Sequence, residues 1–427
     1  MSSTVITIPN EDGISPNQKK KSQFAQFALS FSVPSLIAKQ SKHDKRKVLH
    51  SIKVGIALVL VSLLYLLDPM YDEVGDNAMW AIMTVVVIFE FTAGATLGKG
   101  LLRGIGTLLG GGLGCLVAIL ADEFGKIGNN IVVGTSVFLF GAAVTYCRLV
   151  PRIKRRYDYG AMIFILTFNL VVVSGFRADK IIGLASVRLS TIGMGFAVCI
   201  FTSLFIFPNW ASDELHYSMS SKFEKLGICI EGCLQEYFTQ DNEKETQTKA
   251  YFADCRSVLY SKSNDDSLAN FARWEPWHGK FGLSYPWDKY LQIGDVLREL
   301  SAIIISLRGC LQSPRQPSTT TRHSIVEPCE TVGLHLAWTL GELGESIKKM
   351  ERCPPKALVA SKLQSMKLEL SLIASPSKLG AGDNGEGLAM ASFVFLLLEI
   401  LEKVEELAKE VDELGELAGF QTKFSSI

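Results

Sequence analysis

Four cationic side chains lie within or beside long apolar stretches of this 427-residue chain: Lys53, Lys99, Arg103 and Arg188. A Lys or Arg at the centre of a membrane helix costs about 2.5–3.5 kcal/mol on insertion scales, so each of them calls for an explanation. Lys53 and Lys99 are close to predicted helix ends, where a long side chain can reach the head groups. Several cations converging from different helices also predict a positively charged path for anions.

Two further side chains are candidates for such a path. Glu90 is the one acid that falls well inside an apolar stretch, where it could pair with a cation or take part in gating. Trp80 lies near the outer end of the same stretch, where a tryptophan fits either a membrane interface or a pore wall.

Six apolar segments must position these residues. A spanning helix needs about 20 predominantly apolar residues, because the hydrocarbon core is about 30 Å thick. The predicted spans cover residues 48–67, 77–96, 101–121, 130–147, 158–175 and 186–207. This places Lys99 and Arg103 at a tight turn between the second and third spans. The predicted fold class is an all-α membrane protein with six transmembrane helices followed by a cytosolic helical domain.

Charges between the segments predict the orientation. Basic residues gather before the first span and around residues 148–156, whereas residues 68–76 hold four acids and no base. The positive-inside rule therefore places both termini of a multi-pass protein in the cytosol. The predicted domains are a cytosolic basic arm (1–47), a six-helix transmembrane domain (48–207) and a cytosolic helical domain (208–427).

The third span carries Gly106, Gly110 and Gly114 at four-residue spacing, which predicts a close helix–helix contact.

Residues 208–427 have the mixed apolar and charged pattern of a helical domain. The predicted helices cover residues 214–238, 249–261, 284–312, 331–349, 356–374 and 387–417. The last one carries Ile400, Val404, Leu407, Val411 and Leu414 at alternating spacings of four and three, which predicts a packing seam within the chain or between two chains.

Motifs of catalysis and cofactor binding are missing from the sequence. It contains no Walker loop, no Gly-x-Ser-x-Gly and no His-Glu-x-x-His. The nine cysteines show no metal-ligand spacing. His278, beside aromatic residues and a glycine, favours a structural role. We therefore predict a protein that is not an enzyme, with no catalytic residue, metal or cofactor, and with no nucleic acid among its partners.

Three separated motifs resemble one known family. The first covers residues 75–91 and 94–100, the second begins at Tyr157 and runs to residue 168, and the third is Trp274-Glu-Pro-Trp-His-Gly279. Their residues and order are similar to those of the aluminium-activated malate transporter family of plants. The resemblance is close over residues 48–310 and looser beyond.

The resemblance implies a homodimeric channel that conducts malate and related carboxylates passively, and often chloride or nitrate. It implies an anion pathway at Lys99 and Arg103, which lie inside or next to the first motif, and then at Lys53 and Arg188. Glu90 and Trp80 match as well, as gating or pore-lining residues. The third motif carries over as Trp274, Glu275, Pro276, His278 and Gly279 of the cytosolic domain.

Other functions stay open at this point. A proton-coupled exporter of carboxylic or aromatic acids also fits six helices, with Glu90 as its proton carrier. A membrane-anchored interaction protein would use the seam of the last helix to recruit a partner, although charges inside the spans argue against it. The expected partners are malate and other small anions, the lipid bilayer and a second copy of the chain. The modest basic arm favours the plasma membrane, with the vacuolar or another endomembrane as the alternative.

Overall fold

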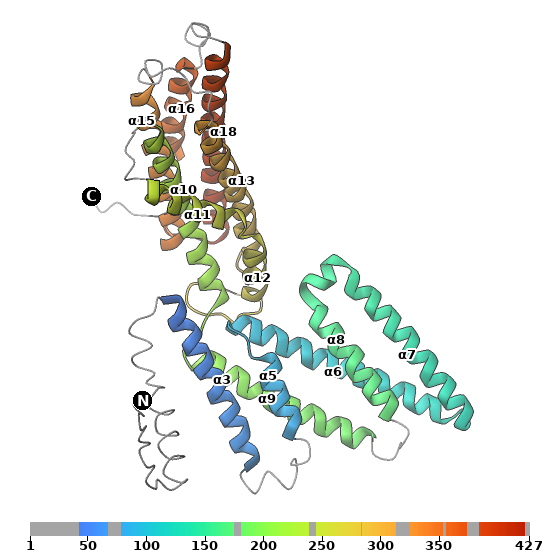
Figure 1. Cartoon of the computed structure of the whole chain (residues 1–427). Helices are drawn as coiled ribbons and strands as arrows, with labels where there is room; N and C mark the ends of the chain where they lie inside the picture. Colours follow the sequence, from blue (N-terminus) through green and yellow to red (C-terminus); the bar gives the residue numbers. More distant parts are fainter. Residues whose placement is uncertain are drawn as a thin grey trace, which may run out of the picture.

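The computed structural model describes residues 42–66, 78–174, 181–238, 245–282, 284–312, 325–352, 356–373 and 384–422. Over these residues the chain is built from helices, and its β-pairing is limited to two isolated bridges. The helices form an N-terminal half from α3 to α9 and a C-terminal half from α10 to α18, which meet end to end (Figure 1).

The N-terminal half contains the apolar segments. Its helices are α3 (Lys42–Leu66), α5 (Ala78–Ile88), α6 (Ala93–Asp122), α7 (Gly125–Leu149), α8 (Pro151–Ser174) and α9 (Ile181–Phe205). Three stretches in the described residues are long and apolar enough to cross a membrane: Ala93–Asp122, Ile127–Leu149 and Arg156–Val173. Met79–Ile88 and Leu189–Phe205 are shorter apolar helices. The expectation of an α-helical membrane protein is thus supported, while the count of six spans stays a prediction.

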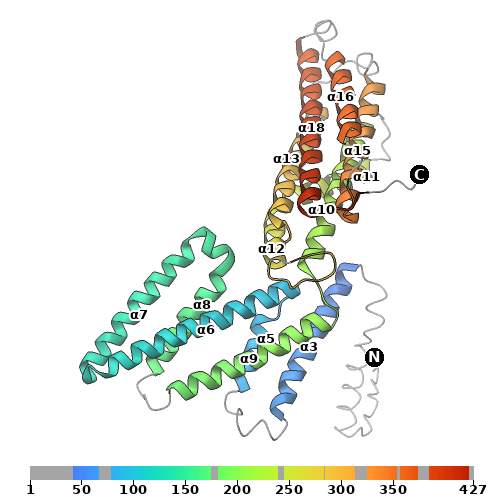
Figure 2. The ribbon, with the colours of Figure 1, turned by 180° about the vertical axis from the view of Figure 1, so that it is seen from behind.

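These helices pack in two groups, which both views show side by side (Figures 1 and 2). Helices α3, α5 and α9 share a core that includes Val61, Val85 and Cys199. Helices α6, α7 and α8 share a second core around Val117 and Phe168. The connection between α5 and α6 joins the two groups, and α6 also packs on α9, where a Cβ added at Gly100 would meet the Phe196 ring.

The glycines of α6 form the predicted contact face, and its partner is α8. A Cβ added at Gly106 would lie 2.6 Å from the carbonyl oxygen of Gly160, and one at Gly110 would lie 2.6 Å from that of Phe164. A Cβ at Gly114 would lie 3.0 Å from the Cβ atom of Val171. Because these positions carry only hydrogen, the two backbones approach directly. The prediction of a close helix contact is confirmed.

One prediction about this half is wrong. Residues 77–96 do not form one helix, because α5 ends at Ile88 and α6 begins only at Ala93. The Thr92 hydroxyl accepts a hydrogen bond from the Ala95 N–H (3.4 Å), and the Thr96 hydroxyl accepts one from the Glu90 N–H (3.0 Å). Threonine hydroxyls that bond nearby backbone groups compete with helix continuation. Lys99 and Arg103 therefore lie inside one long helix and not in a turn between two spans.

The C-terminal half is a bundle of helices. These are α10 (Ala211–Phe238), α11 (Glu245–Leu259), α12 (Lys262–Ala272), α13 (Trp287–Leu311), α15 (Val326–Lys349), α16 (Lys356–Ile373) and α18 (Asn384–Leu417). All six predicted helices are present, and α12, with the polar start Lys-Ser-Asn-Asp-Asp, is an addition. The predicted seam from Ile400 to Leu414 is buried in the core of the same chain, so it packs intramolecularly.

Candidate anion site

The break between α5 and α6 brings two of the predicted site residues together. The Lys99 ammonium, on the second turn of α6, forms an ion pair with the Glu90 carboxylate in the connection. Both side chains are about one-third exposed, at 34% and 36%. Lys99 is thus the cation that pairs with Glu90, as predicted, and its positive charge is balanced within the chain.

Arg103 lies one turn further along α6 and is almost fully enclosed, with 6% of its surface exposed. Its guanidinium donates a hydrogen bond to the Tyr159 hydroxyl of α8 (3.4 Å). Lys99 faces the same tyrosine, with its ammonium 5.8 Å from the ring centroid. Among the described residues, the buried Nε of Arg103 has no hydrogen-bond acceptor. Lys99, Arg103 and Tyr159 together could bind a carboxylate by charge-assisted hydrogen bonds.

Lys53 is also buried, with 4% exposed, but in the other helix group. Its ammonium donates to the Phe207 carbonyl just after α9 (3.0 Å), where Phe207 has a positive φ of 47°. One turn before it on α3, the His50 ring lies 5.9 Å from Phe89 and 5.4 Å from Phe91, the two neighbours of Glu90. In the part of the chain that is described, neither Lys53 nor Arg103 forms an ion pair with a carboxylate.

Two further predicted residues belong to α5 and α9. Trp80 lies half-buried on α5, where its backbone carbonyl accepts a hydrogen bond from the Thr84 hydroxyl (2.6 Å). Arg188 belongs to α9, and its side chain lies outside the described part of the structure.

The third sequence motif lies where the two halves of the molecule meet, and a Cβ added at Gly94 of α6 would lie 2.7 Å from the Glu275 Cγ. The Glu275 carboxylate accepts hydrogen bonds from the N–H groups of Ala211 (2.6 Å) and Ser212 (3.1 Å), the first residues of α10. It therefore caps this helix, whose first turn has unpaired N–H groups and a partial positive charge. Burial raises the pKa of Glu275, while its hydrogen bonds with Ser212 and Ala211 act in the opposite direction.

His278 and its neighbours complete this joint. The His278 ring stacks on Trp210 at 3.8 Å, and its two nitrogens lie 2.9 Å from the Ser212 hydroxyl and 2.8 Å from the Pro276 carbonyl oxygen. Gly279 adopts a φ of 52°, a conformation that favours glycine, in the turn that pairs His278 with Phe281. The expectation of a structural role for His278 agrees with these contacts.

Sequence reasoning missed Tyr159 and His50. Tyr159 stands inside the second motif, but its role depends on α8 lying against α6, which the glycine spacing of α6 did not specify. His50 is a single histidine on the basic start of α3, and no spacing connected it with the residues around Glu90. The signals were therefore tertiary contacts.

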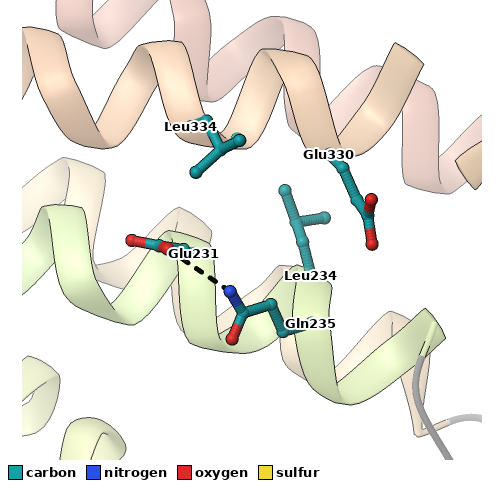
Figure 3. Close-up of a pocket in the computed structure, with 6 residues that line it drawn as sticks. Glu231, Leu234, Gln235, Glu330 and Leu334 are labelled. Atoms are coloured by element: carbon teal, nitrogen blue, oxygen red, sulfur yellow. Dashed lines mark hydrogen bonds between the residues drawn. The ribbon is translucent and has the colours of Figure 1, made fainter. Parts of the chain in front are cut away.

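A cavity of about 130 Å³ lies in the C-terminal half, between α10 and α15 (Figure 3). Its lining includes the carboxylates of Glu231 and Glu330, and Glu231 accepts a hydrogen bond from Gln235 (3.3 Å). Two acidic groups repel a carboxylate ligand, so this cavity does not suit an organic anion. Within the described residues, no group of three His, Cys, Asp or Glu side chains could hold a metal ion.

Comparisons with known proteins agree with the sequence motifs. The family model described as aluminium activated malate transporter matches residues 38–379. Aluminum-activated malate transporter 13 of Arabidopsis thaliana is 44% identical over 351 residues, which cover 80% of this chain and 65% of the relative. Aluminum-activated malate transporter 2 of Arabidopsis thaliana is 40% identical over 386 residues, covering 90% and 77%. Aluminum-activated malate transporter 1 of Triticum aestivum is 35% identical over 398 residues, covering 89% and 84%.

The chain spans slightly less than two thirds of the length of the first of these relatives. The family match nevertheless extends over both halves of the structure, from the start of α3 to beyond α16. The chain therefore belongs to the aluminium-activated malate transporter family, a family of plant membrane proteins.

Proposed function

We propose that this chain forms a passive channel for malate and related organic anions, with chloride or nitrate as further permeant ions. The pathway passes the cluster of Lys99, Arg103 and Tyr159, and Lys53 and Arg188 add positive charge to it. Glu90 and Trp80 act at its gate or wall. The protein's relatives are named malate transporters, which supports the choice of substrate.

One observation carries the proposal: two buried cations of the N-terminal half have no counter-ion among the described residues. Lys53 is 4% exposed and Arg103 is 6% exposed, and within the described part of the chain they donate hydrogen bonds to two neutral oxygens, the Phe207 carbonyl and the Tyr159 hydroxyl. Burying an unpaired charge is costly, so such residues in membrane segments generally serve function. A permeating carboxylate would supply the missing negative charge and an acceptor for the Arg103 Nε.

The ion pair of Lys99 and Glu90 fits conduction in a second way. A channel must attract an anion strongly enough to admit it and weakly enough to release it. Because Glu90 balances the charge of Lys99, the cluster of Lys99, Arg103 and Tyr159 attracts an anion less strongly than it would if both cations were unpaired. Lys99 and Glu90 thus form a weak anion site next to Arg103.

Currents in oocytes test the proposal. Arg103→Glu and Lys99→Glu, each shown to reach the cell surface, are expected to reduce malate currents and to lower selectivity for anions. Arg152→Glu is the matched control, because Arg152 lies in the same half but is exposed at the start of α8. Malate currents that keep their size and selectivity in the Arg103 and Lys99 variants would show that the pathway runs elsewhere.

The alternative is a proton-coupled exporter, which the location of Glu90 inside the cluster favours. In that case the reversal potential would follow the pH gradient as well as the anion gradient. For a channel, it follows the anion gradient alone at every pH, and Glu90→Gln leaves this behaviour unchanged.

The remaining expectations about assembly and location belong to the same proposal. The chain works as a homodimer in a lipid bilayer, with six spans, both termini in the cytosol and the C-terminal half as a cytosolic domain. It acts in the plasma membrane, with the vacuolar membrane as the alternative. A fluorescent fusion expressed in plant cells distinguishes the two membranes.

A further inference from the structure

Trp274 lies where the C-terminal half touches both helices that carry the anion site. It follows α12, and its backbone N–H donates to the Phe271 carbonyl (2.9 Å). Both views place the end of α12 over the start of α6 (Figures 1 and 2). The indole therefore belongs to one half of the molecule and packs on the other.

Two glycines of α6 receive this segment. A Cβ added at Gly98 would lie 3.0–3.3 Å from three atoms of the Trp274 indole, and one at Gly94 would lie 2.7 Å from the Glu275 Cγ. Residues four apart share one face of a helix, so Gly94 and Gly98 form a single docking face. Since neither carries a side chain, the position of α6 depends directly on where the motif lies.

The same indole is close to α8. The Arg156 guanidinium lies 5.9 Å from the centroid of the Trp274 ring. Arg156 stands one helical turn before Tyr159, while Gly98 directly precedes Lys99 on α6. Trp274 thus contacts or approaches both helices within one turn of the residues that face each other in the site.

The opposite side of the motif is fixed to the bundle. Glu275 holds the start of α10 through its two backbone hydrogen bonds, and the Asn209 side chain before α10 donates to the Phe91 carbonyl of the break (3.1 Å). A shift of α10 is therefore passed to Trp274 and to the connection that carries Glu90. Trp277, the second tryptophan of the motif, is 77% exposed.

We propose that Trp274 is a positioning residue of the anion pathway, whose indole sets how Lys99 and Arg103 of α6 face Tyr159 of α8. Through it, the C-terminal half controls the selectivity and the opening of the path. This inference rests on the proposed function, because it assumes that anions pass the cluster of Lys99, Arg103 and Tyr159.

The test compares two tryptophans of the same motif in the full-length channel. Trp274→Ala is expected to change the malate-to-chloride permeability ratio by about fivefold or more, the lower end of typical coupling between sites. Trp274→Phe keeps an aromatic ring against Gly98 and restores most of the ratio. Trp277→Ala, at the exposed position, leaves the ratio as it is. Surface labelling normalises all currents to the number of channels at the membrane.

A permeability ratio at the wild-type value in Trp274→Ala overturns the proposal, even if the current falls with the amount of protein. Gly98→Ala covers the case in which Trp274→Ala does not reach the membrane, because it alters the same contact and removes no side chain. A wild-type ratio in Gly98→Ala then overturns the proposal equally. Failure of the proposed function is recognised separately, since Lys99→Glu and Arg103→Glu would then leave the currents unchanged.

Discussion

Buried cations have different partners in the two halves of the molecule. In the C-terminal half, Lys222 and Arg298 share the fully buried carboxylate of Asp265, at 2.5 Å and 3.1 Å. In the N-terminal half, Lys53 and Arg103 are buried to a similar degree and have no carboxylate partner among the described residues. A charge that is paired inside a protein serves its structure, whereas an unpaired one must be retained for another reason.

The two halves also differ in how their helices pack. The C-terminal half buries large side chains such as Leu297, Leu300 and Ile304 in one continuous core. In the N-terminal half α6 and α8 meet through glycine and backbone, and many large apolar side chains, among them Leu109, Ile119 and Phe138, are exposed on the helices. Water drives the first arrangement, and a lipid surrounding permits the second. The two halves should therefore lose stability through different kinds of substitution.

Removal of the shared carboxylate gives the largest expected loss of stability. Asp265→Ala leaves Lys222 buried without its carboxylate partner and leaves Arg298 with Asp295 alone, which costs about 3–5 kcal/mol. Burial lowers the pKa of Lys222 and Asp265 acts to raise it, so the ammonium depends on this partner. Thermal unfolding of the purified protein, followed by size-exclusion chromatography after heating, measures the loss.

Asp254→Ala is the control for this prediction. Asp254 pairs with Lys225 at 2.9 Å and is 50% exposed, so its loss costs at most about 1 kcal/mol. Equal effects of the two substitutions would remove the distinction between buried and exposed pairs on which the comparison rests.

The glycine contact is expected to be the weak point of the N-terminal half. Gly110→Ala places a methyl group against the Phe164 carbonyl and destabilises the protein by about 1–3 kcal/mol, the usual range for overpacking. Gly112→Ala, where a Cβ meets nothing within 4 Å, leaves stability unchanged or raises it. The same heating assay compares the pair, and identical unfolding temperatures would argue against direct backbone packing.

Buried His216 predicts a dependence of stability on pH in the C-terminal half. Burial lowers its pKa below 6.5, and its ring nitrogens bond the Tyr290 hydroxyl (2.8 Å) and the Lys348 carbonyl (3.3 Å). The unfolded chain takes up a proton as the pH falls through 6.5 while the folded chain does not, so stability is lost below that pH.

The slope for this single proton reaches at most about 1.4 kcal/mol per pH unit. His216→Gln removes the titrating group and should flatten that part of the stability profile. Denaturation curves of both proteins at a series of pH values measure the difference. A profile that keeps its full slope in the variant would assign the dependence to other groups.

The smallest effect on stability is expected at Arg103, together with a large effect on function. Arg103→Leu replaces an unpaired buried charge by an apolar side chain, which is neutral or stabilises by roughly 1 kcal/mol. Malate currents of the same variant should fall strongly. A loss of stability as large as that of Asp265→Ala would instead make Arg103 a structural residue, and the two halves would no longer differ.

Much of this architecture could be predicted from the sequence, because periodic apolar residues report directly on helices. The glycine spacing of α6 identified a packing face, and the seam of α18 identified a buried face. The break at residues 89–92 was missed, since Phe-Glu-Phe-Thr continues an apolar run. The helix is interrupted by hydrogen bonds of the Thr92 and Thr96 hydroxyls and of the distant Asn209 with the backbone of the break. Lys99, Arg103 and Glu90 were found as charges, but their pairing depends on that break.

The contact partners of the site could not be predicted in the same way. Tyr159 and Trp274 occur in recognised motifs, yet their function depends on which helix lies beside them. Hydropathy reports how far a residue prefers to avoid water, and it holds no information about which helices become neighbours. Contacts between segments far apart in the chain therefore came only from the structure.

The glycine face of α6 also has a consequence for inherited variation. Every missense change of a glycine codon encodes a residue with at least a Cβ atom. At Gly106 and Gly110 that atom falls within 2.6 Å of a carbonyl oxygen of α8. A missense allele at either of these two codons is therefore expected to disturb the contact between α6 and α8, whereas Gly104 and Gly112, with nothing within 4 Å of an added Cβ, have room for alanine.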